Sequence, residues 1–278
     1  MITQSAILAP PWWLALVLAA SISIVALQFR WLTTSGAVSA AVVGTLIYWL
    51  GGMFALVPLL IFFVTGSLLS AVVRVRRARS KYLFSGARGA AQVWANAGVP
   101  VAIVIYLAII RGHVPVYQLP NIELLYLAAI TAVTADTWAT EIGILIGGKP
   151  RSLRSWKHVE PGCSGAVTVA GLFGSVAGAI AVPLLVAHLW QLNSAQFTLA
   201  AWAGLIASLA DSLMGASIQV AYRDGEGDSL YDVKPSPQAK QVRGYRWITN
   251  DTVNLLTSLV GVIAALVLMR AATNLFGV

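Results

Sequence analysis

The sequence predicts an all-α polytopic membrane protein with about eight transmembrane helices. Hydrophobic residues make up 58% of the 278 residues and charged residues only 10%, and the mean hydropathy is +0.80. A surface in water cannot accommodate so apolar a composition. Apolar stretches of bilayer-spanning length recur along the whole chain. We therefore expect residues 1–278 to form a single transmembrane domain.

The apolar stretches define the predicted spans, which cover residues 12–29, 35–50, 54–73, 89–110, 122–147, 164–188, 197–221 and 250–273. The second and third stretches form one apolar run, which we divide at Gly51-Gly52 although each half is short for a full crossing. Trp12 and Trp13 follow two prolines and predict an interfacial anchor for a first span that is retained.

Basic residues are concentrated in every second predicted loop. The first loop contains Arg30, and the third, fifth and seventh, at residues 74–88, 148–163 and 222–248, each contain several. The other loops have almost none apart from Arg111. Since basic loops stay in the cytoplasm, we expect an inner-membrane protein with these loops in the cytoplasm and both termini outside. The same bias explains the net charge of +8 without nucleic-acid binding.

Short segments recur in the same order, four spans apart, and predict an internal duplication. Residues 35–39 resemble 164–168, and residues 67–71 resemble 212–216. The repeated halves would be residues 12–110 and 122–273, with the same orientation in the membrane.

Three carboxylates lie within apolar sequence. Asp136 and Glu141 belong to the fifth predicted span, and Asp211 belongs to the seventh. An ionised carboxylate there is costly unless it is paired, bound to a metal or beside a water-filled cavity; the alternative is a protonated acid hydrogen-bonded between helices. Asp136 and Thr140 share one helix face. Asp136 and Glu141 point about 140° apart, so Glu141 is expected to orient a partner unless the helix is distorted.

Two helix starts carry the same polar stripe, an arginine followed by two amides at four-residue spacing: Arg88, Gln92 and Asn96, and Arg246, Asn250 and Asn254. An arginine at the mouth with amides below it suits an anionic, oxygen-rich ligand. Alternatively, the amides bridge helices and serve packing only.

Small residues open two predicted helices, at Ser35-Gly36 and at Gly162, Ser164 and Gly165. Their free N–H groups can bind phosphate, or the same residues only cap the helices. Thr140 and Ser212, close to the aspartates, are expected to contact the same ligand. By the loop assignment, all these elements lie in the cytoplasmic half of the membrane.

Signals for other chemistry are incomplete. Gly143, Gly148 and Lys149 have P-loop spacing, but Pro150 stands where Ser or Thr is required. Cys163 is the single cysteine, and the sequence has no Cys/His zinc pattern and no assignable Ser/His/Asp set.

Five segments carry a family resemblance: Leu32–Ala37, Phe62–Ser67, Arg88–Asn96, Ala135–Gly143 and Thr249–Asp251. They resemble a multi-span membrane family catalogued as a domain of unknown function, whose plant and cyanobacterial members include the phytyl-phosphate kinase of vitamin E synthesis. Residues 135–143 are the most specific part, and the resemblance covers nearly the whole chain. The glycine-rich segment departs from the family at Cys163 and Ala166. The chain is also similar, at a distance, to CTP-dependent polyprenol kinases and CDP-diacylglycerol synthases.

The resemblance implies Mg²⁺-dependent phosphoryl transfer from CTP to an isoprenoid monophosphate, phytyl or geranylgeranyl, giving the diphosphate. The implied catalytic residues are Asp136, Asp211, Arg88 and Arg246, and the implied metal-binding residues are Asp136, Glu141, Asp211 and Asp251. The expected partners are the lipid-like prenyl monophosphate, the nucleotide and membrane lipids, and no nucleic acid.

Two other function classes remain open from the residues alone. Intramembrane acids and duplicated halves also suit an ion-coupled secondary transporter of a small anionic substrate. That class predicts polar residues on both sides of the membrane midplane, whereas the outer halves of the predicted spans are nearly bare. A non-catalytic membrane scaffold is the third class.

Overall fold

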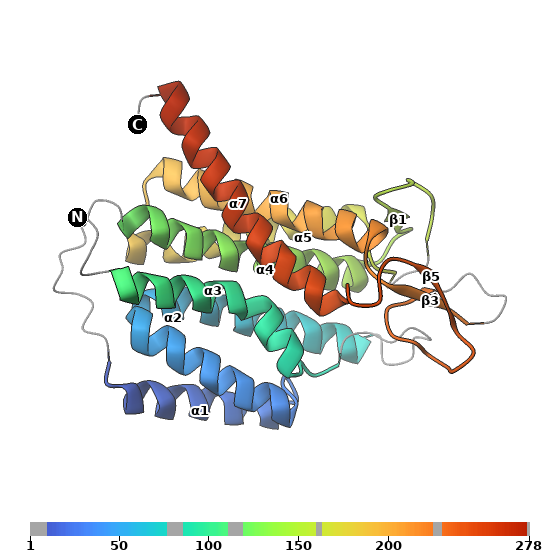
Figure 1. The fold of residues 1–278 in the computed structure, drawn as a ribbon, viewed down its shortest axis with the longest axis horizontal. Helices are drawn as coiled ribbons and strands as arrows, with labels where there is room; N and C mark the ends of the chain where they lie inside the picture. Colours follow the sequence, from blue (N-terminus) through green and yellow to red (C-terminus); the bar gives the residue numbers. More distant parts are fainter. Residues whose placement is uncertain (1–9, 77–85, 111–118, 160–162, 225–229, 277–278) are drawn as a thin grey trace.

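The computed structural model describes residues 10–76, 86–110, 119–159, 163–224 and 230–276. In these residues the helices are α1 (Trp12–Gln28), α2 (Thr34–Arg76), α3 (Ala90–Ile110), α4 (Leu119–Ile146), α5 (Val169–Trp190), α6 (Ser194–Ser217) and α7 (Asn250–Phe276). The short strands are β1 (Arg151–Ser152), β2 (Ala166–Val167), β3 (Ala221–Arg223), β4 (Leu230–Tyr231) and β5 (Lys240–Arg243). The helices form one bundle, and the strands gather at one end of it, which we call the loop end (Figure 1).

Within the described residues, six helices, α2 to α7, are long and apolar enough to cross a membrane. α1 is also apolar but has 17 residues, the lower limit of about 17 for a crossing helix. Large apolar side chains point outward from the bundle, such as Val38, which is 63% exposed, and Phe173, which is 72% exposed. Such a surface suits lipid, and the predicted class, an all-α polytopic membrane protein, is confirmed.

α2 is interrupted at Gly52, whose φ of 65° and ψ of −164° lie in a region open essentially only to glycine. A straight helix of 43 residues would be about 64 Å long. Instead, Arg74 near its C-terminus donates a hydrogen bond to the carbonyl of Arg30, just before its N-terminus, at 3.1 Å. The chain therefore turns back at Gly52, where the sequence predicted a division, and the two arms are visible in blue and cyan in Figure 1. The total of eight spans and the internal duplication stay predictions.

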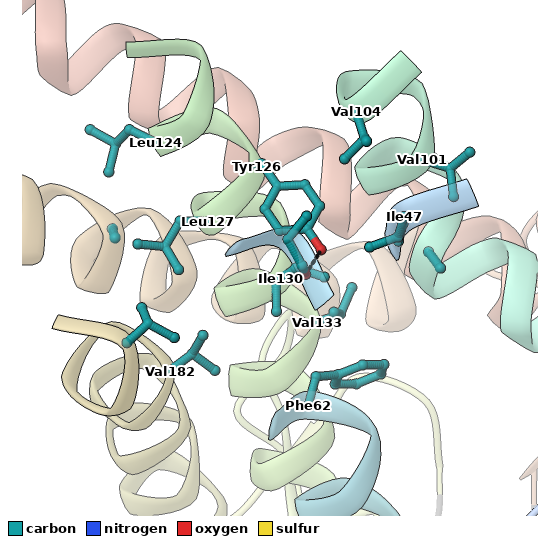
Figure 2. Packing of buried hydrophobic residues seen from close by; sticks show 14 of the residues in the cluster. Ile47, Phe62, Val101, Val104, Leu124, Tyr126, Leu127, Ile130, Val133 and Val182 are labelled. Carbon is teal, nitrogen blue, oxygen red and sulfur yellow. Dashed lines mark hydrogen bonds between the residues drawn. The ribbon is translucent and has the colours of Figure 1, made fainter. Parts of the chain in front are cut away.

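Aromatic side chains from other helices satisfy carbonyl groups beside this turn. Pro58 has no N–H, so the carbonyl of Phe54 lacks its usual helical donor. Trp190 of α5 donates to that carbonyl at 3.2 Å and stacks on the Phe54 ring at 3.8 Å. Tyr126 of α4 donates its hydroxyl to the carbonyl of Ala55 at 2.6 Å, within the main apolar cluster (Figure 2). The turn in α2 is thus held by α4 and α5.

α4 is the central helix, because it packs against α2, α3, α5, α6 and α7. Small residues on its neighbours allow a close approach. A Cβ atom added at Gly174 of α5 would lie 2.6 Å from the carbonyl oxygen of Trp138, and one at Gly204 of α6 would lie 2.5 Å from the side chain of Thr131. This packing places the carboxylates of α4 inside the bundle.

The loop end contains two small antiparallel sheets. β1 pairs with β2, and β3 lies between β4 and β5. These strands shorten two predicted spans. The span predicted from residue 164 begins at Val169, because β2 precedes it and Thr168 caps the helix by accepting the N–H of Gly171 at 2.9 Å. The span predicted to reach residue 221 ends at Ser217, because Ala221 begins β3.

Candidate functional site

A cavity of about 600 Å³ lies at the loop end of the bundle. Its walls include the C-terminal halves of α4 and α6, the N-terminal turns of α3, α5 and α7, and the segment 163–168. These elements are far apart in the sequence, and most of the predicted site residues line this one cavity.

Asp136 of α4 and Asp211 of α6 face each other in the cavity, and their carboxyl groups are in hydrogen-bond contact. Thr257 of α7 donates its hydroxyl to Oδ2 of Asp211 at 2.7 Å. Two carboxyl groups in contact must share a proton or a cation. The structure thus brings together the two intramembrane aspartates that sequence analysis selected.

Arg88 is 8% exposed and lies just before α3. Its Nη1 donates to the hydroxyl of Ser67 at 2.7 Å, and its guanidinium lies 5.7 Å from the ring centroid of Phe62 and 5.9 Å from that of Phe63. The negative charge of Glu141 favours this buried cation. Arg88 is therefore a fixed positive charge at the cavity wall.

The contacts of Arg88 explain the second family segment, Phe62–Ser67. Gly66 leaves room for the guanidinium, because a Cβ atom there would lie 2.9 Å from Nη2 of Arg88. Thr65 accepts a hydrogen bond from Nε1 of Trp138 in the Ala135–Gly143 segment, at 3.1 Å. The segment Leu32–Ala37 also reaches Arg88, since the N–H of Thr33 donates to the Arg88 carbonyl at 3.1 Å, so four of the five family segments meet around Arg88.

Glu141 is 5% exposed and also lines the cavity. Ser70 of α2 donates its hydroxyl to Oε1 of Glu141 at 2.5 Å. Glu141 thus belongs with Arg88 and Ser70.

The four stripe amides all line the cavity: Gln92, Asn96, Asn250 and Asn254. Asn96 of α3 is 7% exposed and Asn254 of α7 is 9% exposed, so one amide of each stripe is buried at the cavity. Thr140, Ser212 and Asp251 line the same cavity. The arrangement offers amide, hydroxyl and cationic groups to an oxygen-rich ligand.

Ser164 and Gly165 reach the cavity through a turn before β2. The Ser164 hydroxyl donates to Asp232, which precedes β5, and accepts a hydrogen bond from Nε2 of Gln219 at 2.7 Å. Burial raises the pKa of the Asp232 carboxyl above its usual range, while the Ser164 hydrogen bond and the charge of Arg243 oppose that shift. The segment between α6 and α7 is thereby tied to the segment before α5.

Two predicted site residues lie elsewhere, and a third is not described. Arg246 is exposed, does not line the cavity, and donates to the side chain of Gln241 at 3.3 Å. Ser35 is exposed, shares a hydrogen bond with Thr33 at 3.1 Å, and also lies outside the cavity. Gly162 lies outside the described residues. The expectation that residues 162–165 open a helix is wrong, since α5 begins later.

The predicted set of four metal-binding carboxylates does not assemble as one cluster. The described part of the chain contains no group of three or more His, Cys, Asp or Glu side chains placed to hold a metal ion. The Asp136–Asp211 pair nevertheless fits Mg²⁺, which is commonly held by one or two carboxylates together with substrate phosphates.

Sequence analysis missed Asp232 and Thr257. No spacing rule indicates Asp232, because it reaches the cavity through a loop contact with Ser164. Thr257 lies in an apolar helix, and its contact with Asp211 depends on how α6 and α7 pack.

Residues 17–262 match the family described as "Integral membrane protein DUF92". Over 258 residues the chain is 30% identical to Protein PGR of Arabidopsis thaliana, covering 84% of this chain and 89% of that protein. It is 32% identical over 188 residues to an uncharacterized membrane protein of Methanocaldococcus jannaschii, covering 67% and 74%. It is 23% identical over 242 residues to the chloroplastic protein VTE6 of Arabidopsis thaliana, covering 86% and 66%. No solved structure matches the chain.

Proposed function

The chain belongs to the DUF92 family of integral membrane proteins, and from that premise we propose that it transfers a phosphoryl group from CTP to an isoprenoid monophosphate, phytyl or geranylgeranyl. The observation that carries the proposal is the contact between Asp136 and Asp211 in a cavity that also contains a buried Arg88. The five segments that resemble a family with a phytyl-phosphate kinase among its members support it, as does the similarity to a chloroplastic plant protein.

The reaction forms one bond and breaks one. An oxygen of the lipid monophosphate attacks the γ-phosphorus of CTP, the bond between that phosphorus and the β–γ bridging oxygen breaks, and CDP leaves. The attacking phosphate is already ionised near neutral pH, so no strong general base is needed. The protein has to position two highly charged groups and offset their charge.

Asp136 and Asp211 are the residues that would hold Mg²⁺, each contributing carboxylate oxygens from a different helix. When bound there, the ion would neutralise charge on the phosphates. Thr257 orients the Asp211 carboxylate through its hydrogen bond.

Arg88 binds the phosphate oxygens of the lipid substrate in this proposal, because a guanidinium presents paired donors to such groups. Its hydrogen bond to Ser67 and the negative charge of Glu141 hold the guanidinium in place before substrate arrives. The buried amides of Asn96 and Asn254 donate to the remaining phosphate oxygens. Basic residues around the loop end favour its placement at the cytoplasmic face of the inner membrane, where CTP is available.

The position of the cavity favours an enzyme over the alternative ion-coupled transporter. The residues that line it come from the loop-end halves of the helices. A transporter of a polar substrate needs polar groups along a path to the other face.

The test uses purified protein in detergent with labelled CTP, Mg²⁺ and phytyl or geranylgeranyl monophosphate. We expect the lipid diphosphate as product, and a loss of about 10³-fold in Asp136→Asn and Asp211→Asn. Asp224→Asn is the matched control, since Asp224 is exposed and bonds Ser236 outside the cavity. Binding of Mn²⁺, followed by electron paramagnetic resonance, should also weaken in the first two variants only. Absence of diphosphate with every prenyl chain length would refute the kinase, and substrate-driven ion flux in proteoliposomes would then support the transporter.

A further inference from the structure

A second, apolar cavity lies between α1, both arms of α2 and α3. Its lining is almost wholly hydrocarbon and includes Leu18 and Ile22 of α1, Ala40 and Leu60 of α2, and Val93 of α3. It follows α2 from Ala40 to Tyr48, a rise of about 12 Å along the helix axis. We call it the apolar groove.

The apolar groove meets the polar cavity at two residues. Arg88 and Asn96 line both, and they are buried. Phe62 and Phe63, under the Arg88 guanidinium, belong to the wall of the groove. The polar cavity, the two aromatic rings and the apolar groove thus follow one another. A molecule with an anionic head and a hydrocarbon tail fits this arrangement, because its head would contact Arg88 while its tail passes the rings into the groove.

We propose that the apolar groove binds the isoprenoid tail of the lipid monophosphate and sets the position of its phosphate beside Arg88. This inference rests on the proposed function and adds to it the site that recognises the tail. Tyr48 of α2 also lines the groove. Gly44 lies so close to Ala19 of α1 that an added Cβ atom would lie 3.0 Å from the Ala19 side chain.

The groove acts through position more than through affinity. Lipid chains of the bilayer are as apolar as the groove, so moving the tail between them yields little hydrophobic free energy. A tail held along α2 nevertheless fixes the depth and direction of the head group, which phosphoryl transfer requires. Filling the groove should therefore slow reaction of long tails and leave short tails able to react.

Ala40→Phe fills the groove, and Val38→Phe is the matched control on the same helix, because Val38 is 63% exposed and does not line the groove. The measurement is kcat/KM with geranylgeranyl monophosphate divided by kcat/KM with geranyl monophosphate. We expect this ratio to fall by about tenfold in Ala40→Phe and to stay unchanged in Val38→Phe. Ala40→Leu should shift the ratio in the same direction by less. The ratio is independent of the active fraction, so partial misfolding does not mimic the effect.

An unchanged ratio in both Ala40 variants overturns the inference and leaves the proposed function intact; the groove would then hold ordinary bilayer lipid. If the wild type makes no diphosphate, the proposed function fails separately. The groove is then judged by photo-crosslinking with a photoreactive geranylgeranyl monophosphate. Labelling that is lower in Ala40→Phe than in Val38→Phe supports the groove, and equal labelling refutes it.

Discussion

Arg88 and Arg246 stand at the same place in two similar stripes, each four residues before its first amide, yet their environments differ. Arg88 is buried against Ser67, Phe62 and Phe63, whereas Arg246 is exposed and contacts Gln241. The amides that follow both arginines line the same cavity.

The difference lies in what holds the backbone before each helix. The N–H of Arg88 donates to the carbonyl of Trp31 at 3.0 Å, and its carbonyl accepts from Thr33 at 3.1 Å. Gly36 permits this contact, since a Cβ atom there would lie 2.1 Å from the Arg88 oxygen. Arg246 instead follows the turn at Gly244, after β5. Helical spacing therefore predicts the direction of the amides, which lie within helices. The two arginines precede their helices, so tertiary contacts decide where their side chains lie.

Among the variants, those of the two arginines should differ most in kcat/KM. We expect Arg88→Ala to lower kcat/KM for diphosphate formation by about 10²–10³-fold, because a fixed cation at the phosphate is lost. Arg246→Ala should stay within about threefold of wild type, as for other exposed charges. Arg88→Lys keeps the charge without the paired donors and should lose about tenfold. Similar losses in Arg88→Ala and Arg246→Ala would show that both arginines act at the site.

Variants of Glu141 show whether the contacts around Arg88 serve stability, activity or both. Glu141→Gln leaves the buried cation without its countercharge, and we expect a loss of about 3 kcal/mol in stability, measured by thermal unfolding in detergent. The double variant Arg88→Met with Glu141→Gln should recover stability, since neither member of this pair then carries a charge, but it should not recover activity. Recovery of activity in the double variant would contradict the role given to Arg88.

The fold was largely predictable because its main signals are local. Apolar length indicated the long apolar helices, and Gly51-Gly52 marked the turn that Gly52 makes with a positive φ. The start of α5 was missed, because residues 166–167 pair with β1 across a loop and Thr168 supplies the cap. Such pairing depends on contacts that no local pattern records.

Site residues could be predicted where a charged side chain lies within an apolar helix and is therefore expected to face the inside of the bundle. Asp136 and Asp211 stood out because carboxylates are costly in apolar sequence, and they prove to be in contact. Helical geometry also predicted a partner for Glu141 other than the aspartates, and Glu141 accepts a hydrogen bond from Ser70 of α2. Asp232 and Thr257 were missed, because a polar residue in a loop and a threonine in a helix are common.

The two buried amides should contribute equally to substrate binding. Asn96 and Asn254 follow the two arginines at equal spacing and are buried to the same extent. Asn96→Ala and Asn254→Ala should each raise KM for CTP or for the lipid monophosphate by about tenfold, the effect of one hydrogen bond to a charged group. Steady-state kinetics with each substrate varied in turn would show which substrate each amide contacts. A loss confined to one variant would mean that only one stripe binds substrate.

The smallest difference in activity is expected between variants of Ser35 and Ser164. These serines are the first residues of the similar segments 35–39 and 164–168. Ser164→Ala removes the acceptor of the buried Gln219 amide and the donor to Asp232, so we expect a loss of activity of about three- to tenfold. Ser35→Ala should stay within about twofold, since Ser35 is exposed and shares a hydrogen bond with its neighbour Thr33.

The pH dependence of the Ser164→Ala loss identifies its cause. The Ser164 hydroxyl favours the charged form of Asp232, whose pKa burial has raised, so this contribution is present above that pKa and is lost as the pH falls through it. The deficit of Ser164→Ala should therefore be largest at alkaline pH and should shrink toward acidic pH, in kinetics measured against wild type at each pH. A deficit that is constant with pH would assign the effect to Gln219 and not to the contact with Asp232.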